Sequence, residues 1–465
     1  MNTPSPRQPL MSRIFFWSLV SSLAGFLFGF DTVVISGAEK RIQELWQLDD
    51  LFHGVATASA LYGTVLGALV GGWPTDRYGR KPTLIGIGIL YFVSAVWSGL
   101  AGDPYAFIVA RFIGGLGVGI STIVAPLYIA EISPPERRGR LTGLYQFNIV
   151  FGILMALLSN FLLARYLPET VAWRWMLGVE ALPAAIYMAA CFVLPESPRW
   201  LLVRKGDHER GRQVLQLIEP GLPPEKVAAH AEEIIASSHA ESLGGREPFW
   251  TPRLRLPILL AFFIALFNQF SGVNAILYYA PRVFEMAGLG KSAALLQSVG
   301  IGVTNLLFTF LGLWLIDRIG RKTLLYMGGV GYVLSLAGIA LGFRYQVSGL
   351  VPVCVFSFMA SHAIGQGAVV WVYISEIFPN RHRAAGQAVG CITLWVACAL
   401  ISTLFPKAAK VFQPEMVFWF FCGMMIIHLV WVKLMVRETK GVPLEQMLDS
   451  FQRGKHPAAG PTADS

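Results

Sequence analysis

Long apolar runs recur along this chain, and their length leaves few folds open to it. Each run spans about 20 residues, which is enough for a helix to cross the hydrocarbon core of a bilayer. Lipid offers no hydrogen bonds to an exposed backbone, so such runs are expected to be helices. We predict twelve spans, at residues 13–36, 51–74, 83–101, 105–130, 142–165, 173–195, 255–288, 292–316, 323–343, 350–378, 384–407 and 413–436.

The charge distribution also favours a membrane protein. Only 14% of the 465 residues are charged, against about 25% in a soluble globular protein. The net charge of +9 is compatible with nucleic-acid binding, but the basic residues gather in alternate loops, which is the positive-inside pattern. We therefore expect a lipid bilayer and no nucleic acid as partner. The location is expected to be an inner or plasma membrane, with both termini cytoplasmic.

The chain is predicted to divide into five segments. Residues 1–12 are expected to be disordered, and two six-helix bundles are expected at 13–195 and 255–436. The hydrophilic segment 196–254 is too long for a simple linker and is predicted to form cytoplasmic helices. Residues 437–465 are expected to form a cytoplasmic tail.

The two halves repeat one another. Gly71–Lys81 recurs as Gly312–Lys322, with seven identical residues at an offset of 241. A Glu-Ile-x-Pro sequence recurs after spans four and ten at an offset of 245 residues. Asp31 and Asn274 occupy equivalent positions of the two halves, at an offset of 243 residues. Each repeat holds an even number of spans, so both halves have the same orientation. A substrate site is then expected between the halves, near mid-membrane.

Acidic and basic residues recur together at the span ends on the predicted cytoplasmic side. An arginine there can pair with a carboxylate from a neighbouring span, and such pairs are predicted to hold this face shut in one conformer. Topological anchoring by positive charge alone is the alternative. The residues are Asp76, Arg80, Glu131 and Arg138 in the first half and Asp317, Arg321, Glu376 and Arg383 in the second.

Three ionisable residues lie inside spans of the first half, where a charge is costly and usually functional. Asp31, Arg111 and Glu180 each lie about six residues from the outer end of a span, which places them roughly 9–10 Å below the outer surface. We predict proton coupling, because burial favours the neutral form of Asp31 whereas a nearby Arg111 favours the charged form. A permanent structural ion pair is the alternative.

Amides and an aromatic form a second polar set within the spans. Amides donate and accept hydrogen bonds, as a neutral polyol requires, and an aromatic face suits the C–H side of a sugar ring. The set is Gln146, Gln269, Asn274, Asn305 and Trp371. Gln269 and Asn274 would lie about 140° apart on an unbroken helix, so we predict a break near Gly272 that turns both toward one cavity. Interhelical hydrogen bonding is the alternative for each amide, and His362 and His428 are expected to be structural.

These motifs resemble the sugar porter branch of the major facilitator superfamily. The match runs from about residue 15 to about residue 445. Its motifs are the doubled Asp-Arg-x-Gly-Arg-Lys loop, Pro195–Leu201, Gln269–Asn274, Glu376–Pro379 and Glu438–Gly441. The resemblance implies an all-α membrane protein with twelve transmembrane helices in two pseudo-symmetric six-helix bundles (the major facilitator fold) and cytoplasmic linker helices.

The resemblance also implies roles for individual residues. The positions matching sugar contacts are Gln146, Gln269, Asn274, Asn305 and Trp371. Asn268 joins these substrate-binding candidates, although the family often has Gln there, and Phe28 and Tyr278 match aromatics that occlude the site. The positions matching the proton-coupling set of bacterial symporters are Asp31, Arg111 and Glu180. Glu196 and Glu438 match further members of the cytoplasmic salt-bridge network.

We therefore expect a carrier that imports a monosaccharide, a hexose or a pentose, by alternating access coupled to a proton. Carboxylates at positions 31 and 180 resemble the symporters, and passive glucose carriers lack them. A facilitative uniporter is the nearest alternative, followed by a polyspecific drug exporter and a membrane sugar sensor. No metal cluster, nucleophile motif or phosphate loop is recognised. We expect no enzyme activity, no catalytic or metal-binding residues, no cofactor besides the proton as co-substrate, and function as a monomer.

Overall fold

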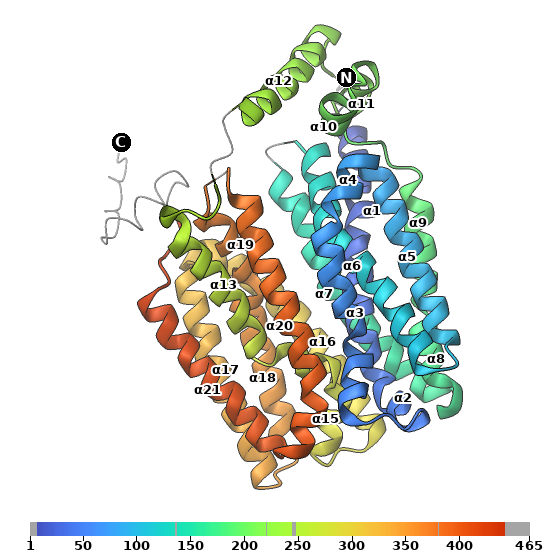
Figure 1. Cartoon of the computed structure of the whole chain (residues 1–465), viewed down its shortest axis with the longest axis vertical. Coiled ribbons are helices and arrows are strands. Elements are labelled where there is room, and N and C mark those ends of the chain that lie inside the picture. The colour runs from blue at the N-terminus through green and yellow to red at the C-terminus, as the bar shows by residue number, and fades with distance from the viewer. Residues whose placement is uncertain (1–6, 135–136, 220, 244–247, 380, 442–465) are drawn as a thin grey trace, which may run out of the picture.

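The structure is a computed structural model that describes residues 7–134, 137–219, 221–243, 248–379 and 381–441. Within these ranges every regular element is a helix. Figure 1 shows two bundles side by side, one built from the first half of the chain in blue to green and the other from the second half in yellow to red.

The first bundle contains the first six predicted spans. Five are long helices: α1 (Arg7–Val34), α3 (Asp50–Val70), α5 (Arg80–Leu100), α6 (Pro104–Ile132) and α7 (Arg138–Tyr166). The sixth is divided into α8 (Glu169–Gly178) and α9 (Ala181–Cys191). A 3-10 turn η1 (Ile35–Gly37) and the short helix α2 (Glu39–Leu45) follow α1, and α4 (Gly72–Tyr78) follows α3.

The second bundle contains the remaining six spans. Four are long helices: α16 (Lys291–Ile319), α17 (Arg321–Arg344), α20 (Arg383–Val411) and α21 (Pro414–Leu434). The seventh span is divided into α13 (Arg255–Phe270), α14 (Val273–Tyr278) and α15 (Ala280–Met286). The tenth is divided into α18 (Leu350–Ile364) and α19 (Gln366–Ile377).

Eleven candidate spans among the described residues are long and apolar enough to cross a membrane. The twelfth, predicted at 173–195, is the pair α8 and α9, whose break leaves two shorter helices. The break follows from Pro183, which lacks the N–H that would bond to the Val179 carbonyl. Large apolar side chains such as Leu182 and Leu334 face outward, at 66% and 69% exposure, as expected for helices in contact with lipid. The protein is therefore a multi-pass membrane protein.

Two predicted spans extend beyond the end of the helix that they match. α3 ends at Val70 rather than at residue 74, and α9 ends at Cys191 rather than at residue 195. In each case a proline lies four residues beyond the last helical residue, at Pro74 and Pro195. The missing proline N–H removes the next hydrogen bond of the helix and ends it.

The start of α1 also differs from the prediction. The helix begins at Arg7, so residues 7–12 are helical where disorder was expected. Pro9 is compatible with this start, because the N–H groups of a first helical turn have no helical partner. The disorder predicted for residues 1–6 lies outside the described residues, as does the predicted tail from residue 442 onward.

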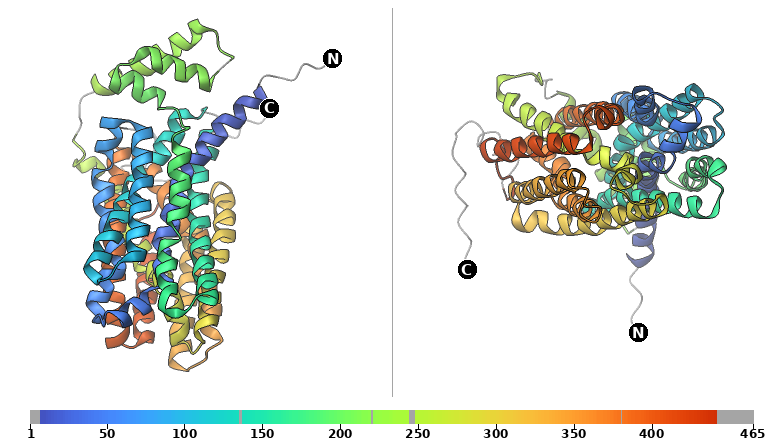
Figure 2. Two further views of the ribbon diagram at one scale, coloured as in Figure 1. Left: turned by 90° about the vertical axis from the view of Figure 1, so that its right-hand side faces the viewer. Right: turned by 90° about the horizontal axis from the view of Figure 1, so that it is seen from below.

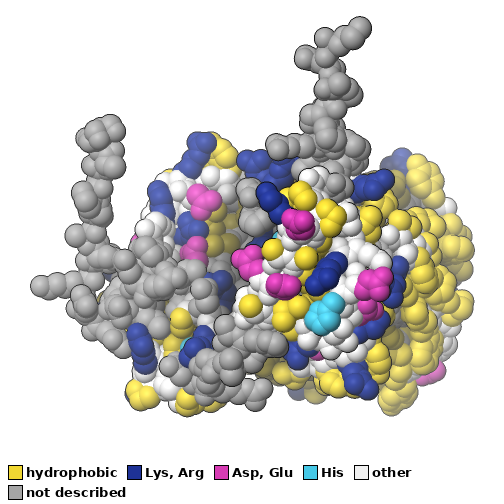
Figure 3. Space-filling view, turned by 90° about the horizontal axis from the view of Figure 1, so that it is seen from above, with side chains coloured by type: hydrophobic (Ala, Val, Ile, Leu, Met, Phe, Trp, Pro, Cys, Tyr) yellow, Lys and Arg dark blue, Asp and Glu magenta, His cyan; other side chains and the backbone are white. Residues whose placement is uncertain are grey.

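The bundles have two distinct ends. We call the end where α1 begins and α21 ends the terminal face, and the end near α2 and α15 the opposite face (Figures 1 and 2). The segment predicted as a helical linker lies over the terminal face and contains α10 (Pro198–Trp200), a π turn η2 (Leu201–Lys205), α11 (His208–Ile218), α12 (Pro224–Leu243) and η3 (Pro252–Leu254). Lys and Arg side chains are spread over the terminal face (Figure 3).

Candidate functional site

The buried charges of the first bundle meet one another. Arg111 of α6 forms an ion pair with Asp31 of α1 and donates a second hydrogen bond to the Asp31 carbonyl oxygen at 2.7 Å. Glu180, between α8 and α9, faces Asp31, and all three side chains are about 1% exposed. The three residues, which the sequence predicts to lie at one depth, are therefore in contact.

The charge balance of this cluster calls for a proton. One guanidinium faces two carboxyl groups, and a buried charge without a counterion is strongly destabilising. One proton on either carboxyl leaves the cluster neutral. Asp31 Oδ2 and Glu180 Oε1 are buried and make no hydrogen bond to other described groups, so each has an oxygen available to bind this proton.

The seventh span is broken at Gly272, as predicted. Gly272 has a left-handed backbone with φ of +83°, ends α13 and begins α14, a conformation that glycine adopts at little cost. The break joins three amides into a chain: Asn274 donates to Gln269 at 2.7 Å, and Gln269 donates to Asn268 at 2.9 Å. Each amide keeps further donor or acceptor capacity, so the chain can also bind a polyol.

The other predicted sugar contacts come from both bundles. Gln146 on α7 is half-buried, and Asn305 on α16 is buried and accepts from Thr309 at 3.5 Å. α7 and α16 pack against each other across the bundle interface, where the rings of Phe147 and Phe310 lie 5.6 Å apart.

The aromatic candidates lie on different elements. Trp371 on α19 is half-buried between two apolar clusters. Phe28 of α1 contacts Trp395 of α20 across the bundle interface, with 5.6 Å between ring centroids. Tyr278, at the end of α14, is fully buried, and its hydroxyl makes no hydrogen bond to another described group. This hydroxyl is therefore available to form a hydrogen bond with a ligand.

The two buried histidines of the second bundle form a separate polar chain. His362 Nδ1 lies 2.5 Å from the hydroxyl of Tyr332, and His428 Nε2 lies 3.1 Å from Gln366 Nε2. Tyr332 also donates to Gln366 at 3.5 Å. These contacts link α17, α18, α19 and α21 within one bundle.

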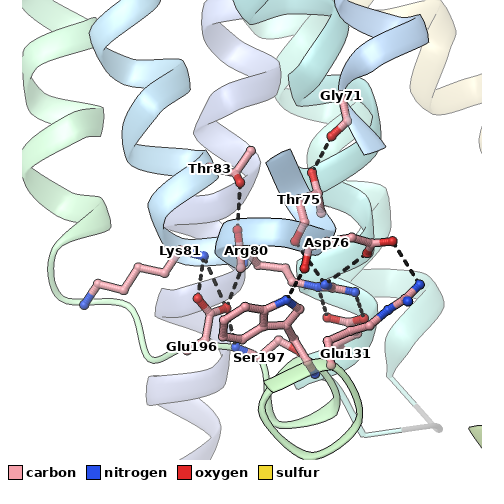
Figure 4. Close-up of polar contacts among 12 residues, drawn as sticks. Gly71, Thr75, Asp76, Arg80, Lys81, Thr83, Glu131, Glu196 and Ser197 are labelled. Atoms are coloured by element: carbon pink, nitrogen blue, oxygen red, sulfur yellow. Dashed lines mark hydrogen bonds and ion pairs between the residues drawn. The ribbon is translucent and has the colours of Figure 1, made fainter. Parts of the chain in front are cut away.

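On the terminal face, Arg80 is the centre of a charged network (Figure 4). Its guanidinium donates to both oxygens of Glu131 at 2.8 and 2.9 Å and lies 3.5 Å from Asp76. Its backbone N–H donates to Glu196 at 2.9 Å. Burial raises the pKa of the Glu196 carboxyl, and backbone N–H groups of Ser197, Arg80 and Lys81 partly counter this effect.

The second half repeats this network. Arg321 donates to both oxygens of Glu376 at 2.7 and 3.0 Å and pairs with Asp317 at 3.0 Å. Its backbone N–H donates to Glu438 at 2.9 Å, and Thr439 donates to Glu376 at 2.6 Å. Arg383 lies at the start of α20 on the same face.

One predicted member of the network has no ion-pair partner among the described residues in this conformation. Arg138 is exposed and forms no ion pair with a described residue, because Arg80 already occupies both oxygens of Glu131. The two networks also differ from the expected closure of this face, because each of these pairs joins elements of a single half. In this conformation they brace each bundle separately.

The sequence analysis missed the contacts that join the bundles. Four ion pairs connect described residues of the two bundles: Lys40–Glu285, Glu39–Arg282, Asp50–Lys410 and Glu169–Lys291. All four lie on the opposite face. Tyr62 of α3 and Thr403 of α20 add a hydrogen bond of 2.7 Å between the bundles. The opposite face is therefore closed in this conformation.

The lysine pairing of Glu169 also shifts its titration. The salt-bridging hydrogen bond from Lys291 lowers the pKa of the Glu169 carboxyl. The side chains of both residues are largely exposed, at 70% and 54%, so this pair is screened by water and contributes little to the closure.

Comparisons with known proteins agree with this architecture. The family model described as sugar (and other) transporter matches residues 17–451. The arabinose-proton symporter of Bacillus subtilis (strain 168) is 33% identical over 453 residues, covering 96% of this chain and 97% of that protein. The D-xylose-proton symporter of Escherichia coli (strain K12) is 33% identical over 476 residues, covering 94% and 95%.

A solved structure shows the same fold. The xylose transporter XylE from E. coli, in a partially occluded inward open conformation, superimposes with a TM-score of 0.82 at 31% identity, covering 93% of this chain and 100% of that one. The family match extends over nearly the whole chain, and the twelve-helix, two-bundle fold accompanies it. The chain therefore belongs to the sugar (and other) transporter family.

Proposed function

We propose that this chain imports a monosaccharide, a hexose or a pentose, together with a proton by alternating access. The observation that carries the proposal is the buried cluster of Asp31, Arg111 and Glu180, in which two carboxyls share one guanidinium. The relatives named for arabinose-proton and xylose-proton symport support both the sugar class and the coupling ion.

The side that this conformation faces follows from the charges of the two faces. The terminal face carries the basic loops and lies in the cytoplasm, together with both termini. The closed opposite face then belongs to the outside, and this conformation faces inward. Its likeness to an inward open structure of XylE supports this assignment.

Proton binding and sugar binding occur in different halves. In the outward-facing state, a proton from outside occupies Asp31, while the proton that keeps the cluster neutral stays on Glu180. Arg111 pairs with Asp31 again when the Asp31 proton leaves toward the cytoplasm. The sugar hydroxyls exchange hydrogen bonds with the amide chain of Asn268, Gln269 and Asn274. The protein works as a monomer without a cofactor, and the proton is its co-substrate.

Uptake into proteoliposomes with an imposed pH gradient tests this function. We expect accumulation of arabinose, xylose or glucose above equilibrium when the outside is acidic. Asp31→Asn abolishes accumulation but leaves sugar exchange across the membrane, because exchange needs no net proton movement. Glu209→Gln, which alters an exposed carboxylate of α11 outside the charged network, is the control and retains accumulation. Uptake of the unaltered protein that ignores the gradient contradicts symport and leaves a facilitative uniporter.

A further inference from the structure

A buried acid, a histidine and an arginine meet where the opposite face closes. Glu39 of α2 and His53 of α3 belong to the first bundle and are 1% and 0% exposed. Arg282 of α15 belongs to the second bundle; its Nε–H donates to Glu39 Oε1 at 3.0 Å, and its Nη2 forms an ion pair with Glu39 Oε2 at 2.8 Å. His53 Nε2 lies 2.7 Å from Glu39 Oε2.

The geometry determines where protons can lie in the closed state. Glu39 is a carboxylate held by Arg282, so it accepts a hydrogen bond from His53 Nε2–H. The neutral imidazole then has its lone pair on Nδ1. This Nδ1 is buried and makes no hydrogen bond to another described group. The Arg282 guanidinium already balances the charge of Glu39, so a proton on Nδ1 would add an unbalanced buried charge.

The three residues lie at a tight contact between the bundles. Gly54, next to His53, approaches α20 so closely that an added Cβ would lie 1.9 Å from the carbonyl oxygen of Thr403. The face cannot open without separating α3 from α20 and α15, since the latter two belong to the second bundle. Opening therefore takes Arg282 away from Glu39, whereas His53 stays beside it.

We propose that His53 is a second proton-binding site, which takes up a proton from outside when the opposite face opens and releases it when Arg282 returns. Protonated His53 replaces Arg282 as the counterion of Glu39. The inference rests on the proposed alternating-access cycle and adds to it a proton that acts on the gate, separate from the Asp31 cluster. Acidity outside thereby favours the open state that admits sugar.

The surrounding charges act in the same direction. The titratable and charged groups around His53 come from both bundles. They are Glu39 and Lys40 of α2, Asp49 and Asp50 at the start of the helix that carries His53, Tyr279 just before α15, Arg282 and Glu285 of α15, and Lys410 of α20. Opening removes the second-bundle members, which are two cations and one anion. The first-bundle members that remain include three carboxylates and one lysine, so the site becomes more negative and binds a proton more tightly.

The magnitude follows from proton linkage. If the open state binds one proton more than the closed state, the ratio of open to closed molecules changes by up to tenfold per pH unit. Spin labels at Gly102→Cys and Val347→Cys, two exposed positions on the opposite face of different bundles, report this ratio by pulsed distance measurements. The five native cysteines are replaced by alanine, and the protein is held in nanodiscs without sugar, between about pH 8 and about pH 5.

Asp31→Asn combined with Glu180→Gln serves as the background, because it removes titration of both carboxyls of that cluster. In this background we expect the open fraction to rise steeply as the pH falls. His53→Gln keeps an N–H donor for Glu39 but cannot titrate, and it should abolish the slope. Glu39→Gln should also abolish it, because the charge that attracts the proton is gone. This second variant answers the question if His53→Gln does not fold.

Lys40→Gln is the matched control. It breaks the ion pair with Glu285 on the same face but leaves the Glu39, His53 and Arg282 cluster intact. The open fraction should increase at every pH while its slope stays. A flat response in the Asp31→Asn, Glu180→Gln background, or a slope that survives His53→Gln, overturns the proposal. The measurement needs neither sugar nor a gradient, so its result is independent of the uptake assay for symport.

Discussion

The substitution Gly54→Ala should hold the opposite face open. The added Cβ would lie 1.9 Å from the Thr403 carbonyl oxygen and 2.8 Å from its carbonyl carbon, whereas ordinary contacts begin at 3.4 Å. Backbone of α20 would have to retreat by about 1.5 Å, the difference between 3.4 and 1.9 Å. Both atoms belong to backbone, so no side-chain rotation relieves the clash.

The cost falls on the closed conformation alone. Overpacking of this kind costs about 1–3 kcal/mol, which corresponds to a shift of roughly 5–150-fold in a two-state equilibrium. The open state separates α3 from α20 and escapes the clash. Gly54→Ala should therefore fold normally but populate the open state, with a longer distance between labels at Gly102 and Val347 and a lower sugar uptake.

Two controls isolate this effect. Gly115→Ala places a Cβ 1.8 Å from the Ala60 carbonyl oxygen, an equally severe clash, but α6 and α3 belong to the same bundle. It should lower the melting temperature without changing the label distance. Gly143→Ala meets nothing within 4 Å and measures the gain in helix propensity, about 1 kcal/mol. If Gly54→Ala lowers the melting temperature as Gly115→Ala does and leaves the distances unchanged, the contact is not a gate.

Two further substitutions test the site and the terminal face. Gly272→Ala puts a residue with a Cβ into a left-handed backbone conformation, at a cost of about 1–2 kcal/mol, and the added Cβ lies 2.6 Å from the Phe421 ring. Sugar affinity measured by calorimetry should therefore fall. An unchanged affinity would show that the amide chain does not depend on this break. Arg80→Lys cannot bind both oxygens of Glu131 and should lower unfolding stability by about 1.5–3 kcal/mol, whereas Arg204→Lys, at 60% side-chain exposure, should leave the thermal melting curve nearly unchanged.

Most of the fold could be predicted from local properties of the chain. Apolar length predicted the spans, and the repeated loop predicted two equivalent bundles. The errors at Val70 and Cys191 arose because apolar residues continue past each helix end, while Pro74 and Pro195 remove the hydrogen bond that would extend the helix. The two prolines are visible in the sequence, but the predicted span ends were placed from hydrophobicity instead.

The site was predictable to different degrees. Asp31, Arg111 and Glu180 are costly at membrane depth, so their position alone suggested that they would meet. The break at Gly272 followed from the need to bring Gln269 and Asn274 to one side. Arg138 does not pair with Glu131 in this conformation, and its spacing from Glu131 along the chain says nothing about competition from Arg80, which comes from another helix.

The inter-bundle contacts left a signal of a different kind. Glu39 and Arg282 are 243 positions apart, the same offset as Asp31 and Asn274, so they are equivalent residues of the two repeats. Equivalent positions can meet only beside the pseudo-twofold axis, and opposite charges there predict an ion pair across it. Arg80 and Arg321 are also equivalent but alike in charge, so they cannot pair across the axis. Each instead binds a carboxylate of its own bundle. Equivalent residues of opposite charge thus indicate a contact that holds the two bundles together, whereas equivalent residues of like charge indicate contacts within each bundle.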